Sequence, residues 1–168
     1  MASKVNRRKK SVGDGIKLRG FARLQICDYG PNGEPNHKVV SDTGWLGPNQ
    51  KTNIGFLNFL SYVLGASAGS QLVSFAAVGT GGTPASNAGS LTGETMVRMP
   101  TTYSAVGSTG VQWAASWASS DCTGSCTIGN AGLYAHSSQL SLGFGISTPG
   151  QTWNTNQSLN RSYVLNMS

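Results

Sequence analysis

Apolar and polar residues alternate over residues 21–28, which is the pattern of a strand with one buried face. Ala22, Leu24 and Ile26 lie on that face. Residues 29–35 then combine an Asn-Gly pair with prolines, which is turn chemistry, and residues 37–41 can return as the partner strand. This part of the chain therefore predicts a β-hairpin.

The spacing of apolar residues changes to a helical period further along the chain. Asn49 or Thr52 can cap the start of this helix, and Gly65 can end it. We expect the helix to pack on a sheet through its apolar face, which comprises Ile54, Phe56, Leu57, Phe59, Leu60, Val63 and Leu64.

The remainder of the chain predicts short strands separated by clusters of Gly and Ser. The expected strands are 71–78, 95–103, 111–119, 127–136, 140–147 and 157–167, with a long loop over residues 79–90. Short strands at this spacing are typical of antiparallel sandwiches and barrels. The sequence thus predicts one mainly β domain over residues 21–168, an antiparallel β-sandwich or barrel, jelly-roll-like, with one short helix.

Within the strand at 111–117, alternation places Val111, Trp113, Ala115 and Trp117 on one face. We expect this face to belong to the core. The alternative is a stacking platform for bases or sugars, which the absence of flanking basic residues disfavours.

The basic charge of the chain is concentrated at its beginning. The net charge is +6, yet residues 1–23 hold eight Lys and Arg against Asp14 alone, a net of +7, so the remainder carries −1. Residues 1–20 form a basic arm with little apolar content, which we expect to be disordered in isolation. Its cations are the candidate partner-binding residues: Lys4, Arg7, Arg8, Lys9, Lys10, Lys17 and Arg19.

Length and composition narrow the class of protein. A chain of 168 residues suits one domain and excludes a multidomain enzyme. No apolar stretch approaches the roughly 18 residues of a membrane span, and no secretory signal is evident. Only 11% of residues are charged, which is low for a soluble domain and leaves few candidates for catalysis.

The candidate catalytic groups do not form a recognisable pattern. His37 and His136 are the two histidines, and no nucleophile elbow accompanies them. Glu94 with Arg98 is expected to be a structural pair or a solvated face. We therefore expect that the protein is not an enzyme.

The cysteines and glycines do not indicate a metal or nucleotide site. Cys122 and Cys126 favour free thiols or a labile local bridge over a metal, because no His or second cysteine pair stands near them. The Gly79–Thr83 loop lacks the Gly-Lys-Ser/Thr ending of a phosphate-binding loop. We expect no metal and no cofactor.

Segments from the second half of the chain together resemble a known structural module. They are Phe75–Pro84, Leu91–Glu94 with Arg98, Thr127–Tyr134 and Gln157–Asn166. Their order and motifs resemble a β-rich module of tailed-bacteriophage virion proteins, of the head-decoration or cement type or the tail or fibre type, over about residues 71–167. Asn130 departs from the module, which more often has Glu there. The resemblance implies a component of the virion and leaves head or tail open.

A neutral β domain with a basic arm is typical of an assembly subunit, since few ions must be desolvated when it packs against neighbours. We expect a capsid-associated cement or decoration subunit whose arm locks onto neighbouring subunits. Its expected partners are the major capsid or tail protein and further copies of itself. The alternatives are a tail or fibre component that contacts the host, and a small coat protein whose arm binds packaged nucleic acid. The arm holds few cations for a coat that must neutralise a genome alone, which disfavours the last alternative.

Overall fold

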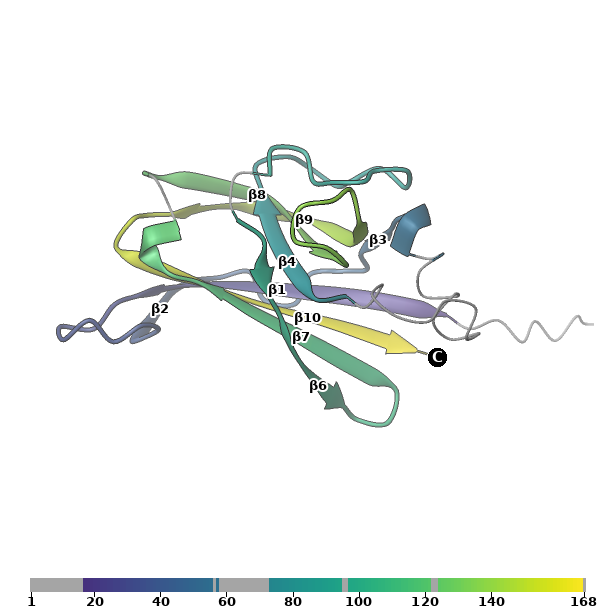
Figure 1. Cartoon of the computed structure of the whole chain (residues 1–168). Coiled ribbons are helices and arrows are strands. Elements are labelled where there is room, and N and C mark those ends of the chain that lie inside the picture. The colour runs from purple at the N-terminus through teal and green to yellow at the C-terminus, as the bar shows by residue number, and fades with distance from the viewer. Residues whose placement is uncertain (1–16, 56, 58–72, 95–96, 122–123, 168) are drawn as a thin grey trace, which may run out of the picture.

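The computed structural model describes residues 17–55, 57, 73–94, 97–121 and 124–167. Within them, ten strands form two five-stranded antiparallel sheets (Figure 1). Sheet A has the order β2-β1-β10-β7-β6 and sheet B the order β3-β9-β8-β4-β5. The strands are β1 (Leu18–Asp28), β2 (Lys38–Asp42), β3 (Gln50–Lys51), β4 (Phe75–Gly79), β5 (Met99–Pro100), β6 (Thr102–Val106), β7 (Gly110–Trp117), β8 (Cys126–Tyr134), β9 (Leu142–Trp153) and β10 (Gln157–Met167).

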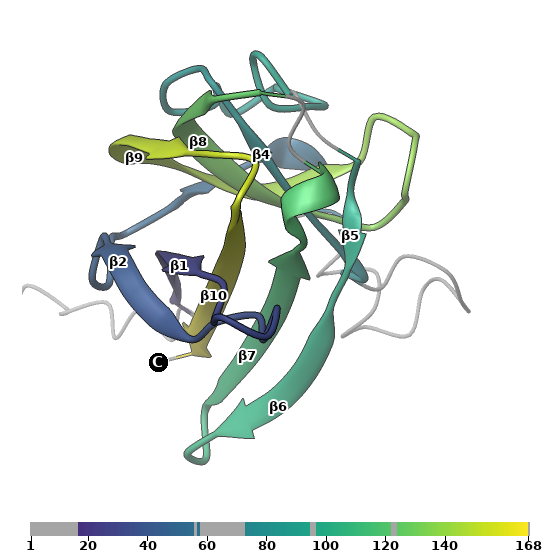
Figure 2. The ribbon, with the colours of Figure 1, turned by 90° about the vertical axis from the view of Figure 1, so that its left-hand side faces the viewer.

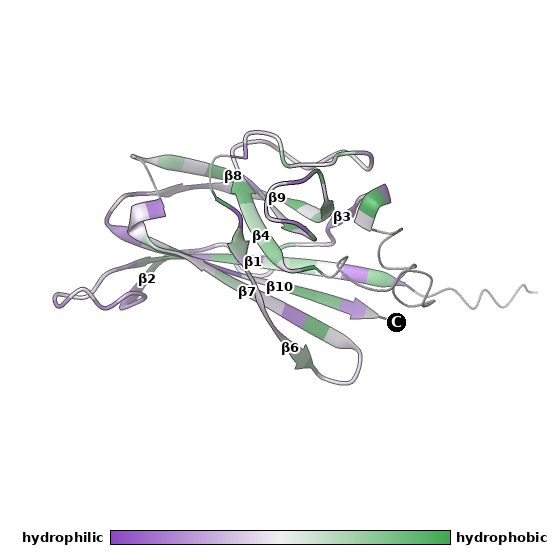
Figure 3. Ribbon diagram, in the orientation of Figure 1, coloured by the Kyte–Doolittle hydropathy of each residue, from purple (hydrophilic) through white to green (hydrophobic). Residues whose placement is uncertain are grey.

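The two sheets lie face to face as layers, which confirms the sandwich and not the barrel (Figure 2). Buried and more exposed residues alternate along β1 and over the second half of β7, and Figure 3 shows bands of differing hydropathy along β7 and β10. The inward side chains form one core between the layers: Ala22, Leu24, Ile26, Ala76, Val78, Ala115, Trp117, Ile128, Ala131, Leu133, Phe144, Ile146, Trp153, Leu159 and Tyr163.

The predicted hairpin is confirmed, because β1 pairs antiparallel with β2. On its other side β1 pairs along its whole length with β10, and Leu18 stands opposite Met167. The strand that follows the arm and the last strand of the chain are therefore neighbours in the middle of sheet A. β1 begins at Leu18, ahead of the expected domain boundary at Phe21.

The start of the predicted helix is capped by Thr52 and not by Asn49. The Gly55 N–H donates to Thr52 Oγ1 at 3.0 Å, and residues 53–55 and 57 are helical. Asn49 Oδ1 instead accepts the Gly20 N–H at 2.8 Å, which ties the loop to β1. The remainder of the expected helix, to Gly65, lies outside the described residues.

Some strand boundaries differ from the prediction. The strand expected at 95–103 is two strands, β5 in sheet B and β6 in sheet A, because the chain changes sheets at Thr101. The strand expected at 140–147 continues as far as Trp153. Pro149 lies where the β8–β9 register shifts, so its missing N–H interrupts no regular pairing.

The tryptophan face of β7 belongs to the core, as expected. Trp117 is fully buried and donates from Nε1 to the Val97 carbonyl at 3.1 Å. Trp113 packs partly buried against the same core, while Val111 remains 37% exposed at the far end of the strand. The stacking-platform alternative is wrong for Trp117, because this ring is inaccessible.

Candidate functional site

The candidate binding residues of the arm divide into two groups. Lys4, Arg7, Arg8, Lys9 and Lys10 lie outside the described residues. Lys17 and Arg19 are described, and both are exposed, at the start of β1. The basic arm therefore joins the sandwich beside the end of β10, with two of its cations open to solvent.

Arg23, the next cation along the chain, already has a partner. Its Nε donates to Asp42 Oδ1 at 2.9 Å and its Nη2 to Asp42 Oδ2 at 2.5 Å, across the β1–β2 hairpin. Hydrogen bonding from the Arg23 guanidinium holds the pKa of Asp42 well below its usual range. Lys17 and Arg19, which we call the arm root, are therefore the last cations of the arm before the Arg23–Asp42 pair.

Beyond Lys17 and Arg19, the outer face of sheet A has cross-strand rows that follow from the register: Arg23–Ser162–Ala114–Thr102 and Gln25–Asn160–Ser116. The only charges in these rows are those of the Arg23–Asp42 pair, which cancel. These positions are half-buried or exposed, and Ser116 donates to Asn160 Oδ1 at 2.7 Å. Such a face of amides and hydroxyls can contact another protein with little cost for desolvating ions.

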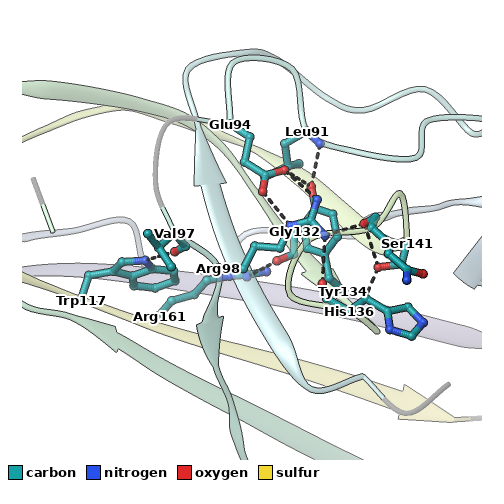
Figure 4. Close-up of polar contacts among 11 residues, drawn as sticks. Leu91, Glu94, Val97, Arg98, Trp117, Gly132, Tyr134, His136, Ser141 and Arg161 are labelled. Atoms are coloured by element: carbon teal, nitrogen blue, oxygen red, sulfur yellow. Dashed lines mark hydrogen bonds and ion pairs between the residues drawn. The ribbon is translucent and has the colours of Figure 1, made fainter. Parts of the chain in front are cut away.

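A second polar cluster lies where the loop of residues 80–98 meets β8 (Figure 4). The Tyr134 hydroxyl donates to Glu94 Oε2 at 2.7 Å and accepts the Leu91 N–H at 2.7 Å. Arg98 donates from Nε to Glu94 Oε1 at 2.7 Å, and its Cζ lies 3.6 Å from the centre of the Tyr134 ring. Its Nη1 reaches the carbonyls of His136 at 2.9 Å and Gln139 at 2.6 Å.

This cluster, Glu94–Arg98–Tyr134, is structural in character. The structural pairing expected for Glu94 and Arg98 is confirmed, and the Arg98 side chain is 7% exposed. Burial, followed by the hydrogen bond to Glu94, raises the pKa of Tyr134, so its hydroxyl stays protonated as a donor. His136 contributes its backbone carbonyl to the cluster. These groups fasten two loops to sheet B.

The glycine-rich motifs hold the same loop against the outer face of sheet B. Asn130 is fully buried, and its Nδ2 donates to the carbonyls of Gly82 and Thr92, both at 3.1 Å. A Cβ on Gly145 would lie 2.6 Å from the Pro84 ring, so only glycine admits the loop there. A carboxylate at position 130 could not donate these bonds, so this contact requires the amide of Asn130.

Arg161 is a buried cation on the inner face of β10. It is 2% exposed, and its Nη1 donates to the Gly132 carbonyl at 2.5 Å. Its Nε and Nη2 have no hydrogen-bond partner among the described residues. Burial lowers the pKa of Arg161 to about 10, which still leaves the guanidinium charged at neutral pH. The core therefore contains a charge, and its one hydrogen bond offsets only part of the free-energy cost of removing it from water.

Replacing Arg161 with Met should raise the free energy of unfolding by about 1 to 3 kcal/mol, because a well-packed apolar chain removes that desolvation cost. Arg161→Ala should lower it, because it leaves a cavity. Urea unfolding of both variants and the parent measures the difference. If both variants lost the same free energy of unfolding, the prediction would be wrong, and the guanidinium of Arg161 would be shown to stabilise the sandwich.

The described residues contain no group of three or more His, Cys, Asp or Glu side chains placed to hold a metal ion. Cys27 is a buried free thiol, and burial raises its pKa. Cys122 lies outside the described residues, so the expected choice between thiols and a local bridge stays a prediction. No helix of the described chain is long and apolar enough to cross a membrane.

Comparison with known proteins adds no relative: no family model matches the chain, and no curated protein matches it.

Proposed function

We propose that the protein is a non-enzymatic structural subunit of a virion, a capsid-associated cement or decoration subunit. In this proposal the basic arm, with Lys4, Arg7, Arg8, Lys9, Lys10, Lys17 and Arg19, binds an acidic surface of neighbouring virion proteins. The sandwich supplies a rigid body from which the arm extends.

The observation that carries the proposal is the separation of charge from fold. The excess of cations precedes residue 24, whereas the remainder of the chain has a net charge of −1. Arg23 is neutralised by Asp42, and the outer face of sheet A beside the arm root is a surface of amides and hydroxyls. A body of nearly zero net charge with a charged extension suits a subunit that packs closely and is held by its arm.

Two further observations bear on the proposal. Several residues that carry the resemblance to phage virion modules, among them Glu94, Asn130 and Tyr134, hold a loop against sheet B, and Gln157–Asn166 forms most of β10, so the resemblance supports a shared scaffold. The run Arg7–Lys10 also suits phosphate groups, so the experiment must separate binding to a protein shell from binding to nucleic acid, although the arm holds few cations for a coat protein.

The test is a variant in which Arg7, Arg8, Lys9 and Lys10 are all replaced by Gln. Attachment to preformed shells free of nucleic acid should weaken by about tenfold to a hundredfold, since each exposed ion pair contributes modestly. Added salt should weaken the parent in the same way, because such pairs are screened over about 8 to 10 Å. Binding is measured by co-sedimentation with shells that lack the subunit.

The control is a double variant, Lys38→Gln with Lys51→Gln, which removes exposed cations from the body and should attach normally. Attachment of the four-Gln variant at the parental level would contradict the proposal. The coat protein would replace this proposal if two results came together. The parent, and not the four-Gln variant, would bind unrelated DNA or RNA, and both proteins would attach equally to empty shells.

A further inference from the structure

The strand edges of the sandwich are unequally protected. β3 and β5 are two residues long, with Lys51 in one and Pro100 in the other. β2 begins with Lys38 and ends with Asp42. Short length, proline and charge are the devices that keep edge strands from pairing with other chains. Of the described edges, β6 alone has none of them.

β6 combines an open edge with neutral, strand-forming residues. Its sequence is Thr-Tyr-Ser-Ala-Val, all five residues are exposed, and Tyr103 is 79% exposed. β7 is the only described strand that pairs with it, so the backbone N–H and C=O groups on its other side have no partner among the described strands. Figures 1 and 2 place the β6–β7 hairpin at the side of the molecule away from β8 and β9.

The inner face of this hairpin is apolar and incompletely covered. Tyr103 stands opposite Trp113, and Ala105 stands opposite Val111. Trp113 is partly buried against the core, whereas Val111 is 37% exposed and Ala105 is exposed. A strand added beside β6 would continue the sheet and extend this apolar layer.

The side chains of β6 are complementary to those of the same strand turned through a two-fold axis. In an antiparallel pair centred on Ser104, each Tyr103 lies opposite Ala105 of the second copy, and each Thr102 lies opposite Val106. Large and small residues then alternate on the inner face, and no charge meets a like charge. The basic arm of a neighbour would bring charges to this neutral edge.

We propose that β6 is a self-association surface, on which β6 of a second copy pairs antiparallel about Ser104 to join two sheets A into one. A five-residue strand pair is a small interface, so the dimer is weak in dilute solution and is reinforced where many copies are held together. The inference does not depend on the proposed virion function, because the pure chain tests it.

The experiment is sedimentation velocity of the full chain over a concentration series. The parent of 17.5 kDa should approach twice that mass as its concentration rises. Ser104→Lys and Ser104→Glu each place like charges opposite each other, and each should raise the dissociation constant by about tenfold or more. An equal mixture of the two variants should restore association as a mixed dimer. Hydrogen exchange of residues 102–106 should slow with concentration in the parent.

The control is Val40→Lys, which adds the same charge at an exposed position of β2, the opposite edge of the sheet, and should associate normally. Three results would overturn the proposal: a parent that stays monomeric at its highest soluble concentration, equal weakening by Val40→Lys and Ser104→Lys, or no recovery in the mixture. Loss of the dimer on removal of residues 1–16 would overturn it too, by identifying the arm as the occupant of the edge.

Discussion

Replacing Arg98 with Met is expected to lower the free energy of unfolding by about 3 to 5 kcal/mol, because it breaks a buried ion pair and leaves polar groups unpaired. Glu94 would keep its bond from Tyr134 and lose its counter-charge. The carbonyls of His136 and Gln139 would lose their donor. Urea unfolding followed by tryptophan fluorescence measures the loss, and hydrogen exchange should show loosening of the loops around residues 80–98 and 135–141.

The matched control is Arg23→Met, which breaks the corresponding pair with Asp42 at the surface. The side chains of that pair are 37% and 28% exposed, so solvent screens the pair and the expected loss is much smaller than for Arg98→Met. Arg98→Lys keeps the charge, but one ammonium group cannot reproduce the hydrogen bonds of the guanidinium. Its loss in the free energy of unfolding should therefore lie between the losses for Arg98→Met and Arg23→Met. Equal losses for Arg98→Met and Arg23→Met would contradict the structural role assigned to the cluster.

Removing residues 1–16 is expected to abolish incorporation into particles while leaving the sandwich intact. The deletion takes away Lys4, Arg7, Arg8, Lys9 and Lys10 and stops before β1, which begins at Leu18. Residues 1–16 contain few apolar side chains, so their loss should shift the unfolding temperature by no more than about 2 °C.

The comparison needs both the melting curve and the particle content of the same variant. Quantitative electrophoresis of purified particles gives the incorporated fraction, and calorimetry gives the unfolding temperature. Normal incorporation without the arm would refute the arm as the attachment element. A large fall in the unfolding temperature would show that the arm is part of the folded domain.

Much of the fold could be predicted because alternation survives wherever one face of a strand is buried. β10 occupies the residues expected for it, and the β1–β2 hairpin follows from an Asn-Gly turn between alternating runs. The change of sheet at Thr101 could not be predicted, since continuous strand propensity does not reveal which sheet a residue joins. The length of β9 was missed because Pro149 and Gly150 indicate a turn unless a register shift accommodates them.

The polar cluster was only partly foreseeable. Glu94 and Arg98 are four residues apart and could be paired from the sequence. Tyr134 is 40 residues from Glu94, and their contact depends on how the loop folds back over sheet B. Arg161 gives no sequence signal, because inward alternation in β10 places a cation where an apolar residue is expected. The free edge of β6 appears only once both sheets and their strand order are known.

The most direct test of the central proposal, a virion subunit held by its arm, is a density map of the intact particle at side-chain resolution. The sandwich should appear on the outside of the shell, with residues 1–17 extended across an adjacent protein and Arg7, Arg8, Lys9 and Lys10 against acidic side chains. An arm directed into packaged nucleic acid, or a particle in which the protein is absent, would contradict the account.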